Sequence, residues 1–189
     1  VSEKGKKKLG YEQAVVYDRV LRFEERDKLM KILYYVYLLD VYMAVANVAK
    51  ERGFVFAKAH PNDKNTLVMK GMFHPFLTKP VGNTIAVDEN SNVIFLTGAN
   101  MAGKSTFMKS FGITVFLAHV GFPVPAKEME FSVQNGMFTT INLPDNLSMG
   151  YSHFYAEVLR VKKVAQQVRQ TQHLIVVFDE LFRGTNVKD

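Results

Sequence analysis

The sequence has no cysteine among its 189 residues, so disulfide bridges and cysteine-ligated zinc sites are excluded. It also shows no secretory signal, because its lysine-rich start runs into residues 10–13, Gly-Tyr-Glu-Gln, and not into an apolar core. No internal repeat or low-complexity tract is visible. These absences fit a reducing compartment, and we expect the protein to be cytoplasmic.

The charge balance excludes few classes of binding partner. A net charge of +6 is compatible with a polyanionic partner, although a bound nucleotide would account for part of it. Four lysines between residues 4 and 8 form the one basic cluster, and a solvated terminus is favoured there over a nucleic-acid contact. The length suits one globular domain with an attached segment, and a start at Val1 without methionine leads us to expect a fragment.

Residues 12 to about 52 have few helix breakers and carry apolar side chains on more than one face. The run at residues 32–49 resembles a membrane span, but Asp40 and Asn47 interrupt it and charged residues 24–28 crowd its entrance. We therefore expect a buried helix that needs partners on most sides, and no membrane.

The main motif lies at residues 98–105, Gly-x-x-x-x-Gly-Lys-Ser, which is the P-loop or Walker A pattern. An apolar run at residues 93–97 predicts a short buried strand before it, and a helix is expected to begin near Ser105. A plain glycine turn is disfavoured, because the spacing, the Lys-Ser pair and the apolar lead-in occur together. We predict that nucleotide phosphates bind here, with Lys104 at the β- and γ-phosphates and the Ser105 hydroxyl on Mg²⁺. The predicted nucleotide-binding residues are Gly98, Ala99, Asn100, Met101, Ala102, Gly103, Lys104, Ser105 and Thr106.

The rest of the pattern predicts an α/β fold in which helices flank a sheet. Short strands are expected at residues 67–69 and 84–87, and two more on either side of an Asn135-Gly136 turn, at 131–133 and 137–141. Helices are expected at residues 106–119 and about 152–170. The apolar run 174–178 is typical of a central parallel strand buried on both faces. Turn-forming residues 59–65 divide a helical segment, 1–60, from a nucleotide-binding domain, 61–189.

Two acidic residues follow that last strand. Asp179 is predicted to hold Mg²⁺ opposite Ser105, because ligands of open α/β sheets bind at the carboxyl ends of the strands. Glu180 is predicted to orient or deprotonate the attacking water. Lys104 would neutralise the developing charge. Asp-Glu after an apolar run is weak by itself, but together with an upstream P-loop it indicates a Walker B strand.

Several stretches carry a family resemblance. Residues 97–106, Thr-Gly-Ala-Asn-Met-Ala-Gly-Lys-Ser-Thr, contain Asn-Met, which most P-loops lack; residues 124–126 read Val-Pro-Ala and residues 178–185 read Phe-Asp-Glu-Leu-Phe-Arg-Gly-Thr. From about His74 onward the chain resembles the ATPase domain of the MutS family of DNA mismatch-repair proteins, a P-loop NTPase of the ABC/MutS type. The helical stretch before it resembles the end of that family's core and lever region.

The resemblance implies a dimer in which each nucleotide is completed by the opposite subunit. Ser152 would reach the partner's γ-phosphate and Arg183 would lie at the same interface; from the residues alone, Ser152 is better explained as a helix N-cap. The family has an aromatic residue after a proline that stacks on the adenine. Here Val81 follows Pro80, so the resemblance implies an aliphatic contact between Val81 and the adenine. Ala99 and Ala102 replace a proline and a glycine of the family pattern, which indicates a divergent member. The remaining sheet strands would lie beyond Asp189, so the fragment by itself is expected to hydrolyse little ATP.

We therefore expect a domain that binds Mg-ATP, dimerises as a homodimer through its nucleotide sites and couples hydrolysis to movement on double-stranded, mismatched DNA. One alternative is a MutS-like paralogue in recombination or another DNA-linked process. A GTP-binding switch is disfavoured, because residues 186–189, Asn-Val-Lys-Asp, have the wrong order for guanine reading. An ABC or SMC-like ATPase is a further alternative, but residues 147–150, Leu-Ser-Met-Gly, only half agree with the signature Leu-Ser-Gly-Gly.

Overall fold

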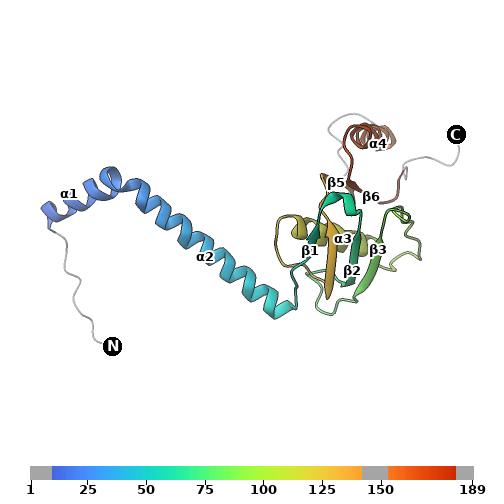
Figure 1. The fold of residues 1–189 in the computed structure, drawn as a ribbon, viewed down its shortest axis with the longest axis horizontal. Helices are drawn as coiled ribbons and strands as arrows, with labels where there is room; N and C mark the ends of the chain where they lie inside the picture. The colour runs from blue at the N-terminus through green and yellow to red at the C-terminus, as the bar shows by residue number, and fades with distance from the viewer. Residues whose placement is uncertain (1–9, 142–152, 182–189) are drawn as a thin grey trace. The chain divides into compact units, whose positions relative to one another are not determined.

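The structure is a computed structural model that describes residues 10–141 and 153–181. The chain divides into two compact units, residues 1–47 and 48–189. Figure 1 shows the helices and strands of each unit. Each unit is described by itself below, and the domain boundary predicted near residue 60 stays a prediction.

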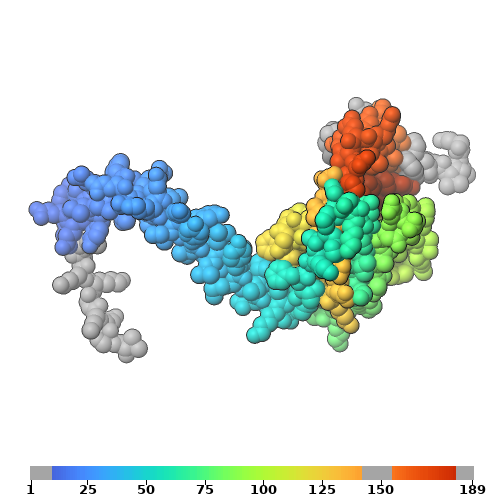
Figure 2. All heavy atoms as spheres, in the orientation of Figure 1, coloured from blue at the N-terminus to red at the C-terminus, as the bar shows by residue number. Residues whose placement is uncertain are grey.

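Unit 1 is helical, as predicted. It contains α1 (Tyr11–Arg19), a π-helical turn (Val20–Glu24) and most of α2 (Arg26–Arg52). None of the described residues of these helices is buried, although α2 carries several tyrosines and valines, and Leu39, which are exposed. In Figure 2 the described part of unit 1 is one helix thick. The burial predicted for this helix is therefore not found in the described part of the chain, which provides no partner for its apolar faces.

By length and composition alone, α2 could also cross a membrane. Its mean hydropathy over an 18-residue window is 1.5, and no residue of that window is buried in the described structure. The core helix of a soluble protein can be equally long and apolar, so length and hydropathy do not distinguish the two cases.

The described residues of unit 2 form two sheets. Their strands are β1 (Lys58–His60), β2 (Leu67–Met72), β3 (Asn83–Val87), β4 (Glu128–Ser132), β5 (Gly136–Thr140) and β6 (Leu174–Phe178). In the four-stranded sheet the strands lie in the order β1-β4-β2-β3, with β1 parallel to β4 and the other neighbours antiparallel. The two-stranded sheet pairs β5 with β6 in parallel, and Thr140 lies opposite Phe178 at its carboxyl end.

The described residues of unit 2 also form the long helices α3 (Lys104–His119) and α4 (His153–Gln170), close to their predicted ranges. Buried side chains of α3 pack on β2 and β4 in one core, and one face of the β5–β6 pair packs against the same core. Its fully buried members include Met69, Met72 and Val124. Burying each such side chain stabilises the fold by roughly 1.5–3 kcal/mol. This core holds α3 against both sheets, so the fold is mixed α/β as predicted.

The strands on either side of Asn135 do not form a hairpin, although Asn-Gly favours one. Its backbone N–H donates to the carbonyl of His173 (2.8 Å) and its side-chain amide donates to the carbonyl of Gln172 (2.8 Å). These bonds attach Asn135 to the start of β6 and direct β5 into the second sheet. Tertiary hydrogen bonds therefore override the local turn preference.

The strand predicted at residues 93–97 is wrong for the described structure. The segment has no strand conformation, and Val93 and Phe95 are 70% and 89% exposed. A strand needs a neighbour that accepts and donates its backbone hydrogen bonds, and the described residues provide none at this position. The apolar composition of residues 93–97 suggested a strand, but it does not show which strand would pair with it.

Candidate functional site

The glycine-rich loop at residues 98–103 joins the exposed segment 93–97 to α3. Its turn is closed by a hydrogen bond from the Ala102 N–H to the Ala99 carbonyl (3.2 Å), and the first helical bond runs from the Phe107 N–H to the Gly103 carbonyl (2.8 Å). Gly103 is the N-cap residue of α3 and has φ +92°. A side chain would be strained at that angle, so glycine is required where the loop becomes the helix.

Lys104 is the first residue of α3, and its side chain folds back over the loop. Its ammonium Nζ donates to the carbonyls of Gly98 (2.8 Å) and Ala99 (3.0 Å). The loop residues 98–103 are exposed, so the ammonium lies at an open, solvent-facing surface beside the helix N-terminus. This arrangement can accept an anion, because the two carbonyl bonds can be exchanged for bonds to phosphate oxygens while the helix N-terminus adds a partial positive charge.

Ser105 and Asp179 meet at the same place although 74 residues separate them. The Ser105 hydroxyl donates to the Asp179 carboxylate at 3.0 Å, and this contact is partly buried. A hydroxyl and a carboxylate are hard oxygen donors of the kind that Mg²⁺ prefers, so the pair fits a magnesium site. Within the described residues no group of three or more acidic or histidine side chains gathers, so phosphate oxygens and water would have to complete the coordination.

Backbone strain also lies at this place. Four described residues other than glycine have positive φ, and two of them are Met101 in the loop (φ +64°) and Glu180 after β6 (φ +45°). Such conformations cost of order 1–3 kcal/mol each and are found disproportionately at functional sites. Glu180 is exposed at the carboxyl end of β6, directly after the residue that binds Ser105.

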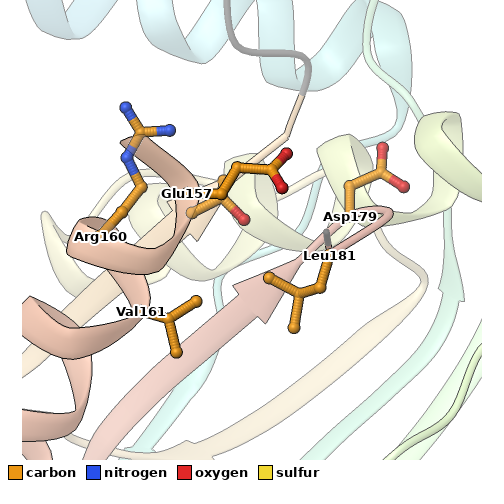
Figure 3. A pocket seen from close by; sticks show the side chains of 6 residues that line it. Glu157, Arg160, Val161, Asp179 and Leu181 are labelled. Carbon is orange, nitrogen blue, oxygen red and sulfur yellow. The ribbon is translucent and has the colours of Figure 1, made fainter. Parts of the chain in front are cut away.

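A small hollow lies beside Asp179, between α4 and the carboxyl ends of β5 and β6. Its volume is about 20 Å³, and its lining residues are Thr140, Glu157, Arg160, Val161, Asp179 and Leu181. The Oε2 atom of Glu157 is buried and has no hydrogen-bond partner among the described residues. Figure 3 shows the Glu157 carboxylate pointing from α4 towards Asp179, whereas the Arg160 guanidinium points away from it.

Sequence reasoning missed Glu157. A signal was available, because Glu157 lies four residues before the apolar Val161 and therefore on the same face of α4. A carboxylate on an otherwise apolar stripe is unusual, since acidic residues are rarely buried without a partner.

The other predicted residues fall into three groups. Asn100, Met101, Ala102 and Thr106 are exposed along the loop and the first turn of α3. Val81 lies between β2 and β3 and is 78% exposed; its neighbours Pro80 and Gly82 line a second, wider hollow of about 480 Å³. Ser152 and Arg183 lie outside the described residues.

The chain matches known proteins over most of its length. Residues 94–189 match the family MutS domain V. The chain is 36% identical over 157 residues to the DNA mismatch repair protein MutS of Leuconostoc citreum, covering 80% of this chain and 18% of that protein. It is 31% identical over 186 residues to the protein of the same name from Persephonella marina, covering 94% and 21%. The chain therefore spans about a fifth of the length of the curated relatives it matches.

Proposed function

This chain belongs to the MutS family, and we propose that it is a P-loop NTPase domain that binds Mg-ATP at residues 98–106 and hydrolyses it. The observation that carries the proposal is the Ser105–Asp179 hydrogen bond of 3.0 Å. It supports a Walker A loop and a Walker B strand that end at one place, with the Lys104 ammonium on the loop beside them. A glycine turn with only a structural role would need neither a lysine over the loop nor a carboxylate opposite the serine.

Each residue has a proposed part in hydrolysis. Loop N–H groups and the Lys104 ammonium bind the β- and γ-phosphates, and Ser105 and Asp179 hold Mg²⁺. When bound, Mg²⁺ neutralises negative charge on the phosphates. Glu180 orients a water molecule and accepts its proton as the water oxygen bonds to the γ-phosphorus and the bond to the bridging oxygen breaks.

The first test is equilibrium binding of a fluorescent ATP analogue with Mg²⁺. Lys104→Ala is expected to abolish detectable binding, because the loop loses the ammonium that would bind the phosphates. Lys109→Ala is the matched control, since Lys109 is exposed on the same helix and is expected to leave binding unchanged. Equal binding by the Lys104→Ala protein and the unaltered chain would contradict the proposal.

The second test concerns Glu180. In a preparation that turns ATP over, Glu180→Gln is expected to keep nucleotide affinity and to lower kcat by about 100-fold or more, because the amide accepts no proton. Glu89→Gln, in an exposed turn, controls for the loss of one negative charge. Normal turnover by Glu180→Gln would assign the base to another residue.

The wider role extends the same proposal to the whole protein. Its curated relatives are named DNA mismatch repair proteins, which supports coupling of the nucleotide state to binding of double-stranded, mismatched DNA. We propose a cytoplasmic homodimer formed through the ATPase domains, with Ser152 and Arg183 at the partner's nucleotide and Val81 at the adenine. Crosslinking from a photoreactive group attached to a cysteine introduced at Ser152, with and without Mg-ATP, tests the dimer, because the sequence has no other cysteine and the group would lie at the partner's nucleotide loop. Failure to crosslink with Mg-ATP would contradict it.

A further inference from the structure

We infer that Glu157 is a positioning residue of the nucleotide site, and that it holds the Asp179 carboxylate through one water molecule in the hollow between them. Neither sequence motif contains Glu157, which lies on α4 and not on the loop or on β6. The inference deepens the proposed function and rests on it for the effect on Mg²⁺. The bridging water itself can be observed without any nucleotide.

The first step is the unpartnered oxygen. Glu157 Oε2 is buried and receives no hydrogen bond from the described residues. Carboxylate oxygens are acceptors only, and a buried one without a donor is destabilising. The cost is removed when a donor enters the hollow, so Glu157 favours a ligand that donates hydrogen bonds.

The second step is the size and polarity of the hollow. Its volume of about 20 Å³ exceeds the 10–15 Å³ that one water needs. Two of its lining side chains are carboxylates, Glu157 and Asp179. A water molecule has two hydrogens to donate, so it can donate one to each carboxylate and lower the repulsion between them.

The third step is what else the hollow contains. The guanidinium of Arg160 points away from Asp179, as Figure 3 shows, so it does not replace the water between the two acids. The Thr140 hydroxyl donates to the Val177 carbonyl at 3.5 Å. Val161 and Leu181 contribute only apolar atoms. Water is therefore the donor that the described lining leaves room for.

The consequence concerns Asp179. Its Oδ2 accepts the Ser105 hydroxyl at 3.0 Å, and the water would hold the carboxylate from the side of α4. Two fixed contacts restrict the rotation of the side chain, so the oxygens are already oriented for Mg²⁺. Partners of this kind behind a metal ligand typically raise metal affinity by about 10–100-fold.

The first test is a crystal structure of the unaltered chain at a resolution that shows ordered water. The inference expects one water within hydrogen-bond distance of both Glu157 and Asp179. A dry hollow, a direct contact between the two side chains, or a metal ion with oxygen ligands near 2.0–2.1 Å in the hollow would each overturn it.

The second test separates positioning from folding. We would measure ATP binding with EDTA and as a function of Mg²⁺ concentration for Glu157→Ala, Glu157→Gln and Val161→Ala. Glu157→Ala is expected to raise the Mg²⁺ midpoint by about tenfold and to leave affinity in EDTA unchanged. Glu157→Gln keeps a carbonyl acceptor for the water, so its Mg²⁺ midpoint is expected to lie closer to that of the unaltered chain. Val161→Ala enlarges the same hollow without removing an acceptor and is expected to leave the midpoint unchanged.

The outcomes distinguish the two proposals. Mg-ATP binding by the unaltered chain, with an unchanged midpoint in Glu157→Ala, would overturn the role of Glu157 and leave the proposed function standing. If Glu157→Ala lost ATP affinity equally with Mg²⁺ and in EDTA, Glu157 would have only a structural role, and its role as a positioning residue would be overturned. No binding of ATP by the unaltered chain would overturn the proposed function, and the role of Glu157 with it.

Discussion

The contact between Ser105 and Asp179 makes a quantitative prediction about stability without nucleotide. A hydrogen bond to a charged group contributes roughly 1.5–3 kcal/mol when shielded from water. The contact is only partly buried, so solvent screening reduces the expected contribution to about 1 kcal/mol. We therefore expect the variants Ser105→Ala and Asp179→Ala to be coupled, because each removes the same bond.

The assay is a double-mutant cycle by urea unfolding, followed by circular dichroism, on the unaltered chain, both single variants and the double variant. The expected coupling is about 1 kcal/mol, whereas Ser105→Ala combined with Glu89→Ala should be additive within about 0.3–0.5 kcal/mol. Additivity of Ser105→Ala and Asp179→Ala within the same limits would refute the reasoning, because it would mean that the loop and β6 are not held together before nucleotide binds.

Three further predictions concern the scaffold. Met69→Ala removes a fully buried side chain and is expected to lower the free energy of unfolding by about 2–5 kcal/mol in urea. Gly103→Ala, at φ +92°, is expected to destabilise by about 1–2 kcal/mol, whereas Gly112→Ala inside α3 is expected to stabilise slightly; an added Cβ has nothing within 4 Å at either glycine. Two hydrogen bonds hold the pKa of the Glu130 carboxyl below its ordinary value of 4.5. The larger effect comes from His60 (2.8 Å) and the smaller from Lys58. The resulting stability is present above pH 4.5 and is lost as the pH falls through the lowered pKa, so unfolding of Glu130→Gln should depend less on pH in that window.

Each of these predictions has a control and a contradicting result. Met43→Ala, on an exposed site of α2, should change the free energy of unfolding by no more than about 0.5 kcal/mol. Equal effects of Met69→Ala and Met43→Ala would place the core elsewhere. Equal effects of the two glycine variants would mean that the angle at Gly103 carries no constraint. Identical acid unfolding curves for Glu130→Gln and the unaltered chain would remove Glu130 from the pH dependence.

Local patterns predicted the elements whose partners lie within the described chain. The apolar run 174–178 became β6, and the helix after the glycine loop became α3 with a start at Lys104. The central position and burial on both faces predicted for that strand were wrong for the described structure, because β6 pairs there with β5 in a two-stranded sheet and all its residues are partly buried. The two motifs also led us to expect Ser105 opposite Asp179, and the Ser105 hydroxyl lies 3.0 Å from the Asp179 carboxylate. These features depend on short-range signals, namely continuous apolar residues, glycine at a positive φ and an N-terminal helix turn. The roles of the two residues stay predictions.

Features that depend on a distant partner were not predicted correctly. Segment 93–97 has the apolar composition of a buried strand, but the described chain offers no neighbour for its backbone. Asn135 has the local preference for a hairpin, yet its bonds to residues 172 and 173 place β4 and β5 in different sheets. The place of Glu157 depends on how α4 packs beside β6, which periodicity alone does not give.

The central claim is that the loop binds a triphosphate through its backbone and Lys104, beside Ser105 and Asp179. Hydrogen exchange of the unaltered chain, with and without ATPγS and Mg²⁺, tests it most directly, because bound phosphate oxygens would accept hydrogen bonds from the loop amides. We predict slower exchange at residues 100–106 and unchanged exchange in the polar turn at residues 88–91. Exchange at residues 100–106 that stays unchanged at saturating nucleotide would contradict the claim.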